Sequence, residues 1–534
     1  MRSTRVVARV SFALVVLLFF AARSMFAINC VAVHHPPPSE ADTAYLAGDY
    51  AKATRLYQAD LAKSPGEAGS IIGLVHALLL QQKVQEAADA LHSSSASAPE
   101  SPALMTLRGE VELRQGDPQQ AAATAVASVK LDSCNPQTLL LLSRLEELNS
   151  QYATARKMLL SAHQLDPEDP QIRLAWIRTL PANQRISEMQ AYLAAPTGDS
   201  ADERRDRQTD LDHLKAWATE PRKPCTMVST ATAAEIPFVP ILGNSQRTIA
   251  FGLAVKINDH TARLAIDTSY NARLPIDGVS GILISRAVAQ HSGLKAIYQN
   301  DVLGTGGQAP RSGFVSIADS VSIGDVVFHD CAVQVMDVNF ANGAEGIIGL
   351  DILSNYLVTL DFPAKKMTLE TLPARPQGSV STNGLYNRYT APEMKDYHPI
   401  FRSGSDLILP LSINGKQSML FVADTAIVFS EFSPGAAFQL LNGRKDPKYE
   451  DRGALAKMDS SITMNNVQLS LGDFSWNEAL MGTFDTSRFT DDSGMEISGM
   501  VGLKTLSGMT LHLDLRDGLV KFDSDPKRKS PLLF

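Results

Sequence analysis

The spacing of hydrophobic residues changes once along the chain, near Cys225. Before that point apolar residues recur at intervals of three and four, which predicts amphipathic helices. After it apolar and polar residues alternate between turns rich in glycine and asparagine, and threonine, valine and isoleucine become common, as is typical of strands. The pattern predicts a multidomain protein, all-α first and all-β afterwards, with Pro221 ending the last helix.

The helical part repeats with a period of 34 residues. Small residues keep this interval over four units, at Ala53, Ala87, Ala121 and Ala155. A proline recurs at Pro65, Pro99 and Pro167. The pattern resembles the tetratricopeptide repeat, a helix-turn-helix unit that stacks into a solenoid. This resemblance implies a solenoid with a charged capping helix over 41–220, which would bind a protein or peptide partner.

The β part contains a second, longer repeat. Residues 322–328 recur as 470–476, an offset of 148, and residues 346–353 recur as 499–506, an offset of 153. Two homologous β-lobes therefore lie in tandem, over 226–375 and 406–534. The polar, turn-rich residues 376–405 are predicted to connect them.

Each lobe has an apolar strand that ends in Asp-Thr, at Asp267-Thr268 and at Asp424-Thr425. In the first lobe a glycine-bearing hairpin follows, Gly304-Thr305-Gly306-Gly307. Over roughly 226–530 the chain resembles the pepsin-like and retropepsin-like aspartic peptidases, including the bacterial aspartyl protease family. The resemblance implies a bilobal all-β fold with Asp267 and Asp424 as the catalytic pair.

The same resemblance assigns supporting roles. Thr268 and Thr425 would hydrogen-bond across the axis between the lobes, and residues 304–307 would form a flap over the substrate. Two carboxylates about 3 Å apart cannot both be ionised, so they share one proton. The ionised member then activates water while the protonated member polarises the scissile carbonyl. Because one chain carries both lobes, no homodimer is required, and the substrate would be an extended peptide or protein.

Nine extra residues interrupt the first catalytic loop. The two Asp-Thr pairs are 157 residues apart, whereas the strands after them are 148 apart, so residues 269–277 form an insertion before Gly278. Asp277 is therefore an alternative catalytic residue. The second loop has Ala426 where the family has glycine. Two functions remain open: an active endopeptidase, and a catalytically degenerate peptide-binding or scaffold protein.

Composition narrows the choice of partners and cofactors. Forty-nine Lys and Arg against 57 Asp and Glu give a net charge of -8 over 534 residues, without the basic field that nucleic acids require. Eleven histidines form no HExxH motif, so we expect neither a metal nor another cofactor. The four cysteines are widely spaced, so they allow at most two disulfides, and the sequence does not determine their pairing.

The N-terminus is typical of an export signal. Arg2, Arg5 and Arg9 precede thirteen uncharged residues at 10–22, and small residues follow. We therefore assign 1–30 to a signal peptide or, if uncleaved, an N-terminal membrane anchor, and 31–40 to a proline-rich spacer. The predicted location is the periplasm or the extracellular space, with membrane contact through this segment only.

Overall fold

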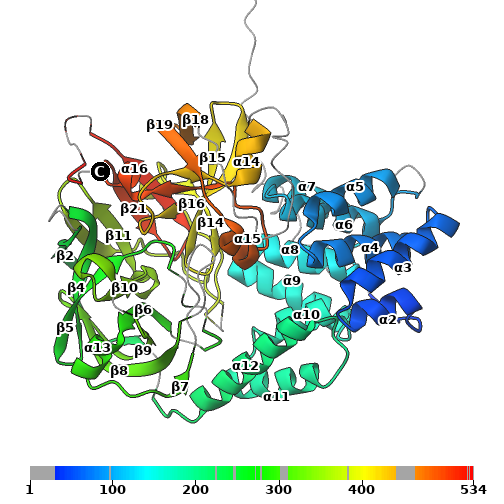
Figure 1. The fold of residues 1–534 in the computed structure, drawn as a ribbon, viewed down its shortest axis with the longest axis horizontal. Coiled ribbons are helices and arrows are strands. Elements are labelled where there is room, and N and C mark those ends of the chain that lie inside the picture. Colours follow the sequence, from blue (N-terminus) through cyan, green and yellow to red (C-terminus); the bar gives the residue numbers. More distant parts are fainter. Residues whose placement is uncertain are drawn as a thin grey trace, which may run out of the picture.

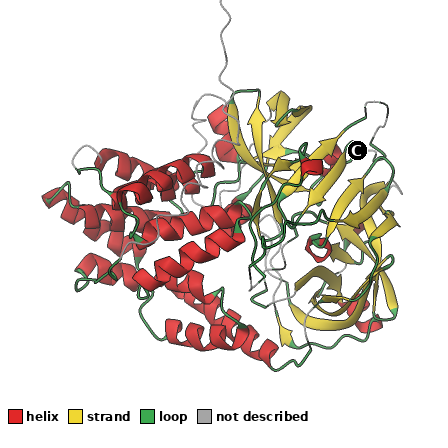
Figure 2. Ribbon diagram, turned by 180° about the vertical axis from the view of Figure 1, so that it is seen from behind, coloured by secondary structure: helices red, strands yellow, loops and turns green. Residues whose placement is uncertain are grey.

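The computed structural model describes residues 30–534 except 95–97, 223–224, 244–247, 271, 273, 277–278, 301–310, 339, 382–383, 441–463, 526, 528–529 and 533–534. A helical region comes first and a β-rich region follows it (Figures 1 and 2). The predicted signal or anchor falls outside the described residues. Within them, no helix is long and apolar enough to cross a membrane.

The helical region keeps the 34-residue period of the sequence. Its helices are α2 (Glu40–Leu46), α3 (Tyr50–Lys63), α4 (Ala68–Leu80), α5 (Val84–Ser94), α6 (Pro102–Arg114), α7 (Pro118–Leu131), α8 (Pro136–Leu148), α9 (Tyr152–Leu165), α10 (Pro170–Ile177), α11 (Ala182–Leu193) and α12 (Ala201–Ala218). Helices α3, α5, α7 and α9 each begin 34 residues after the previous one, and so do α4, α6, α8 and α10. The repeated unit is therefore a pair of helices.

Local chemistry explains where these helices begin and how closely they pack. Asp49, Ser101 and Asp117 accept hydrogen bonds from backbone N–H groups in the first turns of α3, α6 and α7. Proline occupies the first turn of α6, α7, α8 and α10, where a missing N–H is harmless. The repeated alanines, such as Ala53 and Ala121, are fully buried, so neighbouring helices approach closely.

The two ends of the helical region contact each other. The Gly198 N–H donates to the Leu46 carbonyl at 3.0 Å, and the Tyr50 hydroxyl donates to the Gly198 carbonyl. Gly48 has φ +75°, and a Cβ there would lie 2.4 Å from the Asp199 carbonyl oxygen, so only glycine fits. A disulfide joins Cys30 to Cys134, so the segment before α2 is tied to the turn before α8.

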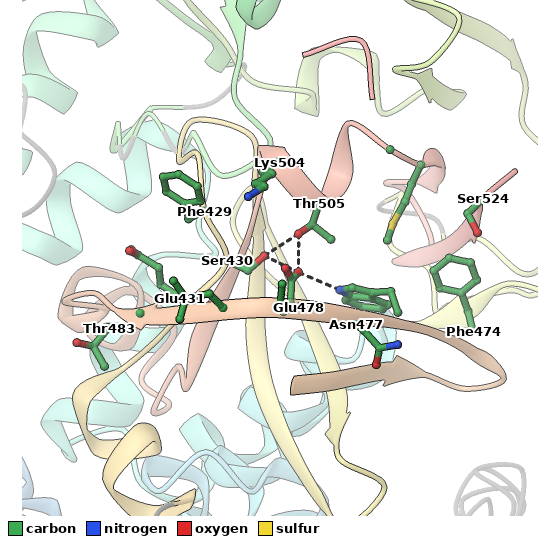
Figure 3. A pocket seen from close by; sticks show the side chains of 16 residues that line it. Phe429, Ser430, Glu431, Phe474, Asn477, Glu478, Thr483, Lys504, Thr505 and Ser524 are labelled. Carbon is green, nitrogen blue, oxygen red and sulfur yellow. Dashed lines mark hydrogen bonds between the residues drawn. The ribbon is translucent and has the colours of Figure 1, made fainter. Parts of the chain in front are cut away.

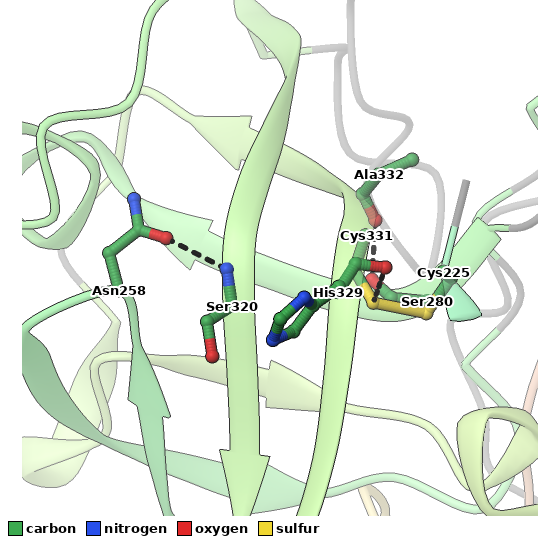
Figure 4. The surroundings of a disulfide bond; sticks show 7 residues. All are labelled: Cys225, Asn258, Ser280, Ser320, His329, Cys331 and Ala332. Atoms are coloured by element: carbon green, nitrogen blue, oxygen red, sulfur yellow. Dashed lines mark hydrogen bonds between the residues drawn. A yellow bond between two sulfur atoms is a disulfide. The ribbon is translucent and has the colours of Figure 1, made fainter. Parts of the chain in front are cut away.

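The first lobe is one sheet in the order β1-β9-β6-β10-β5-β4-β8-β7, with β3 paired to β4. Its strands are β1 (Thr226–Met227), β3 (Val239–Leu242), β4 (Thr248–Ile257), β5 (His260–Ile266), β6 (Val279–Ser285), β7 (Tyr298–Gln299), β8 (Gly313–Ile323), β9 (Val326–Met336) and β10 (Gly346–Ile348), with helix α13 (Arg286–His291). A second disulfide, Cys225–Cys331, fastens β1 to β9 (Figure 4).

The second lobe is a sheet in the order β14-β15-β16-β20-β17-β19-β18. Its elements are β14 (Phe401–Ser403), β15 (Asp406–Ile413), β16 (Gln417–Asp424), β17 (Glu431–Phe432), α14 (Pro434–Leu440), β18 (Met464–Leu471), β19 (Phe474–Thr483), α15 (Ser487–Ser493), β20 (Gly499–Gly502) and α16 (Leu503–Leu506). The predicted connector 376–405 is not only a linker, because it contains β14 and β13 (His398–Pro399), and both pair within sheets.

A third sheet joins the lobes, in the order β13-β22-β21-β11-β12-β2. It contains β2 (Ala233–Pro237), β11 (Tyr356–Asp361), β12 (Lys366–Thr371), β21 (Thr510–Asp514) and β22 (Leu519–Asp523). Strands β11 and β21 are equivalent in the two lobes, and they pair antiparallel with Thr359 opposite His512, its counterpart 153 residues later. The lobes are thus related by an approximate twofold axis, and a continuous apolar core runs through both.

The helical region packs against both lobes. Leu141 and Leu145 of α8 share an apolar cluster with Val422 and Met500 of the second lobe. Leu214 and Trp217 of α12 share another with Ile276, Val315 and Ile317 of the first lobe. The connector also takes part, since its Asn387 exchanges hydrogen bonds with Thr154 of α9 at 2.8 and 3.0 Å. The predicted capping helix α12 therefore also forms part of the domain interface.

Candidate active site

Equivalent strands of the two lobes carry Asp267 and Asp424. Asp267 follows β5, which pairs in parallel with β10, and the Asp267 N–H donates to the Ile348 carbonyl at 3.0 Å. Asp424 ends β16, which pairs in parallel with β20 and aligns Asp424 with Gly502. Each aspartate is therefore fixed at the end of a central strand of its sheet. Both are nearly inaccessible, at 8% and 4% exposure.

The two threonines join these loops by reciprocal hydrogen bonds. Thr268 Oγ1 donates to the Ala423 carbonyl, and Thr425 Oγ1 donates to the Ile266 carbonyl, both at 2.7 Å. Each hydroxyl also accepts the backbone N–H of the other threonine, at 3.1 and 3.2 Å. This arrangement fixes the two loops against each other across the axis between the lobes.

Each aspartate accepts a backbone hydrogen bond from the residue two positions later. The Ser269 N–H donates to Asp267 Oδ1 at 2.9 Å, and the Ala426 N–H donates to Asp424 Oδ1 at 2.7 Å. The Ser269 hydroxyl adds a second bond to the same Asp267 oxygen at 3.0 Å. Ser269 and Ala426 therefore form the same backbone contact in the two loops, although the family has glycine after Asp-Thr.

The two carboxyl groups form a buried, interacting pair. Burial, and secondly the negative charge of Asp267, raise the pKa of Asp424 to about 7. Burial also raises the pKa of Asp267, which the hydrogen bonds from Ser269 and the nearby Arg488 guanidinium partly oppose. One proton therefore stays on the pair up to about neutral pH. This protonation state suits acid–base catalysis.

Two further ionisable residues interact electrostatically with this pair, one by acting on it and one by being acted on. The guanidinium of Arg488, on α15, lowers the pKa of Asp267. Asp406 is 1% exposed, and neither of its carboxylate oxygens has a hydrogen-bond partner among the described residues. Burial raises the pKa of Asp406 well above its usual range, and the charges of Asp492, Asp267 and Asp424 add to this effect.

The insertion in the first loop leads away from the carboxylates toward the helical region. The Tyr270 hydroxyl donates to the Gln334 side chain, whose Nε2 donates to the Ala272 carbonyl at 2.9 Å. Farther along, Arg185 of α11 donates to the Pro275 carbonyl at 3.1 Å, and Ile276 packs with Leu214 and Trp217. The chain therefore leaves the Asp267 loop after Tyr270, and the hydrogen bonds of Asp267 stay formed.

Other predicted site residues lie where the structure gives no description. Asp277, the alternative catalytic residue, is outside the described residues, and so is the predicted flap, Gly304 to Gly307. For metals, the described part of the chain contains no group of three or more His, Cys, Asp or Glu side chains that could hold an ion.

Sequence reasoning missed Ser269, Arg488 and Asp406. The sequence analysis placed Ser269 in the insertion, but its position directly after Asp-Thr, like that of Ala426, was a usable signal. Arg488 and Asp406 carried none, because they are 64 and 18 residues from Asp424 and only the folded second lobe brings them near the pair.

Comparison with known proteins points to the same part of the chain. Residues 253–352 match the sequence model of a family described as aspartyl protease. The aspartic proteinase from Irpex lacteus is 13% identical, with 56% of this chain and 100% of that chain covered and a TM-score of 0.34. No curated protein matches the chain. The β region thus contains an aspartyl protease-like domain.

Two other solved structures are similar over shorter parts of the chain. The retropepsin-like aspartic protease from Rickettsia conorii is 15% identical, with 28% of this chain and 96% of that chain covered and a TM-score of 0.18. MamA is 11% identical, with 34% of this chain and 99% of that chain covered and a TM-score of 0.21.

Proposed function

We propose that this protein is an aspartic endopeptidase that hydrolyses extended peptides with Asp267 and Asp424. The observation that carries the proposal is the buried carboxyl pair, whose loops are joined by reciprocal threonine hydrogen bonds and whose Asp424 has its pKa raised to about 7. A pair that holds one proton can supply a base and an acid at the same time.

In the proposed reaction a water molecule lies between the two carboxyl groups. The ionised aspartate takes a proton from this water as the water oxygen attacks the scissile carbonyl carbon. The protonated aspartate transfers its proton to the carbonyl oxygen, which becomes a hydroxyl of the tetrahedral intermediate. The aspartate that took the proton of the water then gives it to the leaving nitrogen as the C–N bond breaks, and the other aspartate takes a proton back from a hydroxyl of the intermediate, so the pair again holds one proton. Thr268 and Thr425 keep the two loops at the required separation.

We further propose that the helical region is a tetratricopeptide-repeat solenoid that binds a protein partner or presents the substrate. The regular 34-residue spacing of the helix pairs supports this assignment. Export to the periplasm or out of the cell is supported by the basic, then apolar N-terminus and by two disulfides, which persist in oxidising compartments.

A catalytically degenerate peptide-binding protein is the second candidate. The observations that favour it are the replacement of the family's glycine by Ser269 and Ala426 and the insertion after the first of these. In this alternative the cleft between the lobes binds an extended peptide and releases it uncleaved.

The test is cleavage of a mixed peptide pool by the purified full chain, with products identified by mass spectrometry between pH about 3 and about 8. We expect cleavage by the wild-type chain and none by Asp424→Asn. Cleavage that persists in the variant would refute the catalytic pair. Peptide binding without cleavage at any pH would favour the degenerate candidate.

A further inference from the structure

A cavity of roughly 610 Å³ lies in the second lobe, outside the catalytic pair (Figure 3). Strand β19 borders it on one side, and the segment before β17 and helix α16 border it on the others. Its apolar surface comes from Phe474, Trp476 and Met509. The Nζ atom of Lys504 lies 5.2 Å from the centre of the Phe429 ring. Nothing in the proposed peptidase mechanism uses this cavity.

Along most of its length, the edge of β19 that faces the cavity pairs with no other strand in the part of the chain that the structure describes. On its other side β19 pairs with β18 from Phe474 to Met481. On the cavity side, among the described residues, it pairs only with β17, through Gly482 and Thr483. Backbone groups on such an edge can hydrogen-bond to an added strand.

In the first lobe, the edge equivalent to that of β19 is covered by another strand. Strand β9 is the counterpart of β19, 148 residues earlier, and β1 pairs antiparallel with it, opposite Phe328 and His329. The Cys225 N–H donates to the Asp330 carbonyl at 2.6 Å, and the Val228 N–H donates to the Val327 carbonyl at 2.9 Å. An extended segment of this chain therefore covers the edge of β9.

In the second lobe the equivalent position has no such tether. Cys331, which fixes β1 through the disulfide, corresponds to Ala479 (Figure 4 shows the disulfide). The neighbouring Ala332 is 1% exposed, whereas its counterpart Leu480 is 56% exposed. Phe429, across the cavity, is 50% exposed. Among the described residues, Leu480 thus lies exposed beside a strand edge that pairs only at Gly482 and Thr483.

Three ionisable side chains line the cavity, those of Glu431, Glu478 and Lys504, and Glu478 is already hydrogen-bonded. Glu478 accepts hydrogen bonds from the Ser430 hydroxyl at 2.8 Å, the Trp476 indole N–H at 3.2 Å and the Thr505 hydroxyl. An occupant therefore does not need to bring a charge to pair with Glu478. The chemistry suits uncharged main chain along β19 and apolar side chains toward Phe429 and Leu480.

We propose that this cavity and the β19 edge bind an extended, uncharged segment of a partner protein by strand addition, antiparallel to β19, as β1 adds to β9. Main-chain hydrogen bonds would supply part of the affinity, and apolar side chains at alternate positions would supply the specificity. The site would recruit a partner protein through residues other than the carboxyl pair, since neither Asp267 nor Asp424 lines the cavity. It does not depend on the catalytic activity proposed above.

The test uses the full chain with Asp424→Asn, so that hydrolysis cannot consume the probe. The probe is a fluorescein-labelled peptide that copies residues 225–232 with serine in place of Cys225, followed by fluorescence anisotropy. We expect saturable binding that weakens about tenfold or more in Leu480→Asp, because an apolar contact is replaced by a charge. Leu131→Asp is the matched control, since Leu131 is also exposed, at 66%, but lies on α7. It should leave binding unchanged.

A second probe separates strand addition from a merely apolar contact. The same peptide with N-methylated backbone amides keeps its side chains but cannot donate main-chain hydrogen bonds, so it should not bind. The proposal is overturned if Leu480→Asp binds as well as the parent chain, or if no binding occurs up to about 1 mM peptide. It is also overturned if sedimentation shows that Leu480→Asp dissociates a dimer, because a second copy would then be the occupant.

Discussion

The two β-lobes share an Asp-Thr loop but differ in what surrounds it. In both, a strand ends in Asp-Thr, the threonine bonds across the axis, and the backbone N–H two residues after the aspartate donates to its carboxylate. Within the described residues, the first lobe alone carries an insertion that contacts α11 and α12, and there alone a disulfide-tethered strand covers the sheet edge. The symmetric centre therefore does not need symmetric surroundings.

This comparison indicates which contacts fix the positions of the two aspartates. The geometry of the carboxyl pair is set by short contacts at the axis, so the insertion can leave the loop without displacing Asp267. The helical region packs on Val422, two residues before Asp424, and on Ile276, at the far end of the first-lobe insertion. It therefore contacts both lobes.

The largest effect on cleavage is expected from the substitution that decides whether Asp267 or Asp277 is the catalytic residue of the first lobe. Asp267→Asn should lower kcat/KM for peptide cleavage by about 10²- to 10⁴-fold, because it removes one member of the acid–base pair. Asp277→Asn is the matched control and should leave kcat/KM near the wild-type value. The opposite ranking would transfer the catalytic role to Asp277 and remove the symmetry of the two loops.

The disulfide of the first lobe gives the next largest effect. Cys225→Ser combined with Cys331→Ser should lower the free energy of unfolding by about 2–4 kcal/mol, since it releases both the loop and the β1 strand. Cys30→Ser with Cys134→Ser is the matched control for loop size, because the two disulfides span 106 and 104 residues. Urea denaturation measures both. Unchanged stability of the first variant would show that β1 does not depend on its tether.

Substituting the two threonines tests whether Thr268 and Thr425 contribute equally to stability, as their equivalent hydrogen bonds suggest. Thr268→Val and Thr425→Val each remove a hydroxyl that donates one hydrogen bond and accepts another, which should lower the free energy of unfolding by about 1–3 kcal/mol. The two values should be similar and kcat should fall in both. A loss confined to one variant would contradict an equal role for the two loops.

The smallest effect concerns the contact between the insertion and the helical region. Ile276→Val should lower the free energy of unfolding by about 0.5–1.5 kcal/mol. Ile257→Val, in the first-lobe core, makes the same change at another buried isoleucine and should have a similar stability effect. Both variants should keep the wild-type cleavage rate, because the contacts that fix Asp267 lie at the axis between the lobes and do not include Ile276. A cleavage rate that falls only in Ile276→Val would show that the insertion does act on the Asp267 loop.

Periodicity made much of the architecture predictable. The 34-residue step of the alanines anticipated the helix pairs, and the Asp-Thr pairs anticipated the two loops that meet at the axis. Contacts between distant segments were not predictable, because no local pattern reports them. Examples are the approach of Arg488 to Asp267, the pairing of Cys225 with Cys331, and the packing of Ile276 on α12.

The most direct test of the catalytic pair is kcat/KM for one cleaved peptide, measured with the full chain from pH about 3 to about 9. Activity requires one proton on the pair, and burial together with Asp267 raises the pKa of Asp424 to about 7, so the proton is lost as pH rises through that value. We predict that kcat/KM declines above about pH 7 and that Asp424→Asn is inactive throughout. An undiminished rate at pH about 9, or cleavage by the variant, would contradict the account.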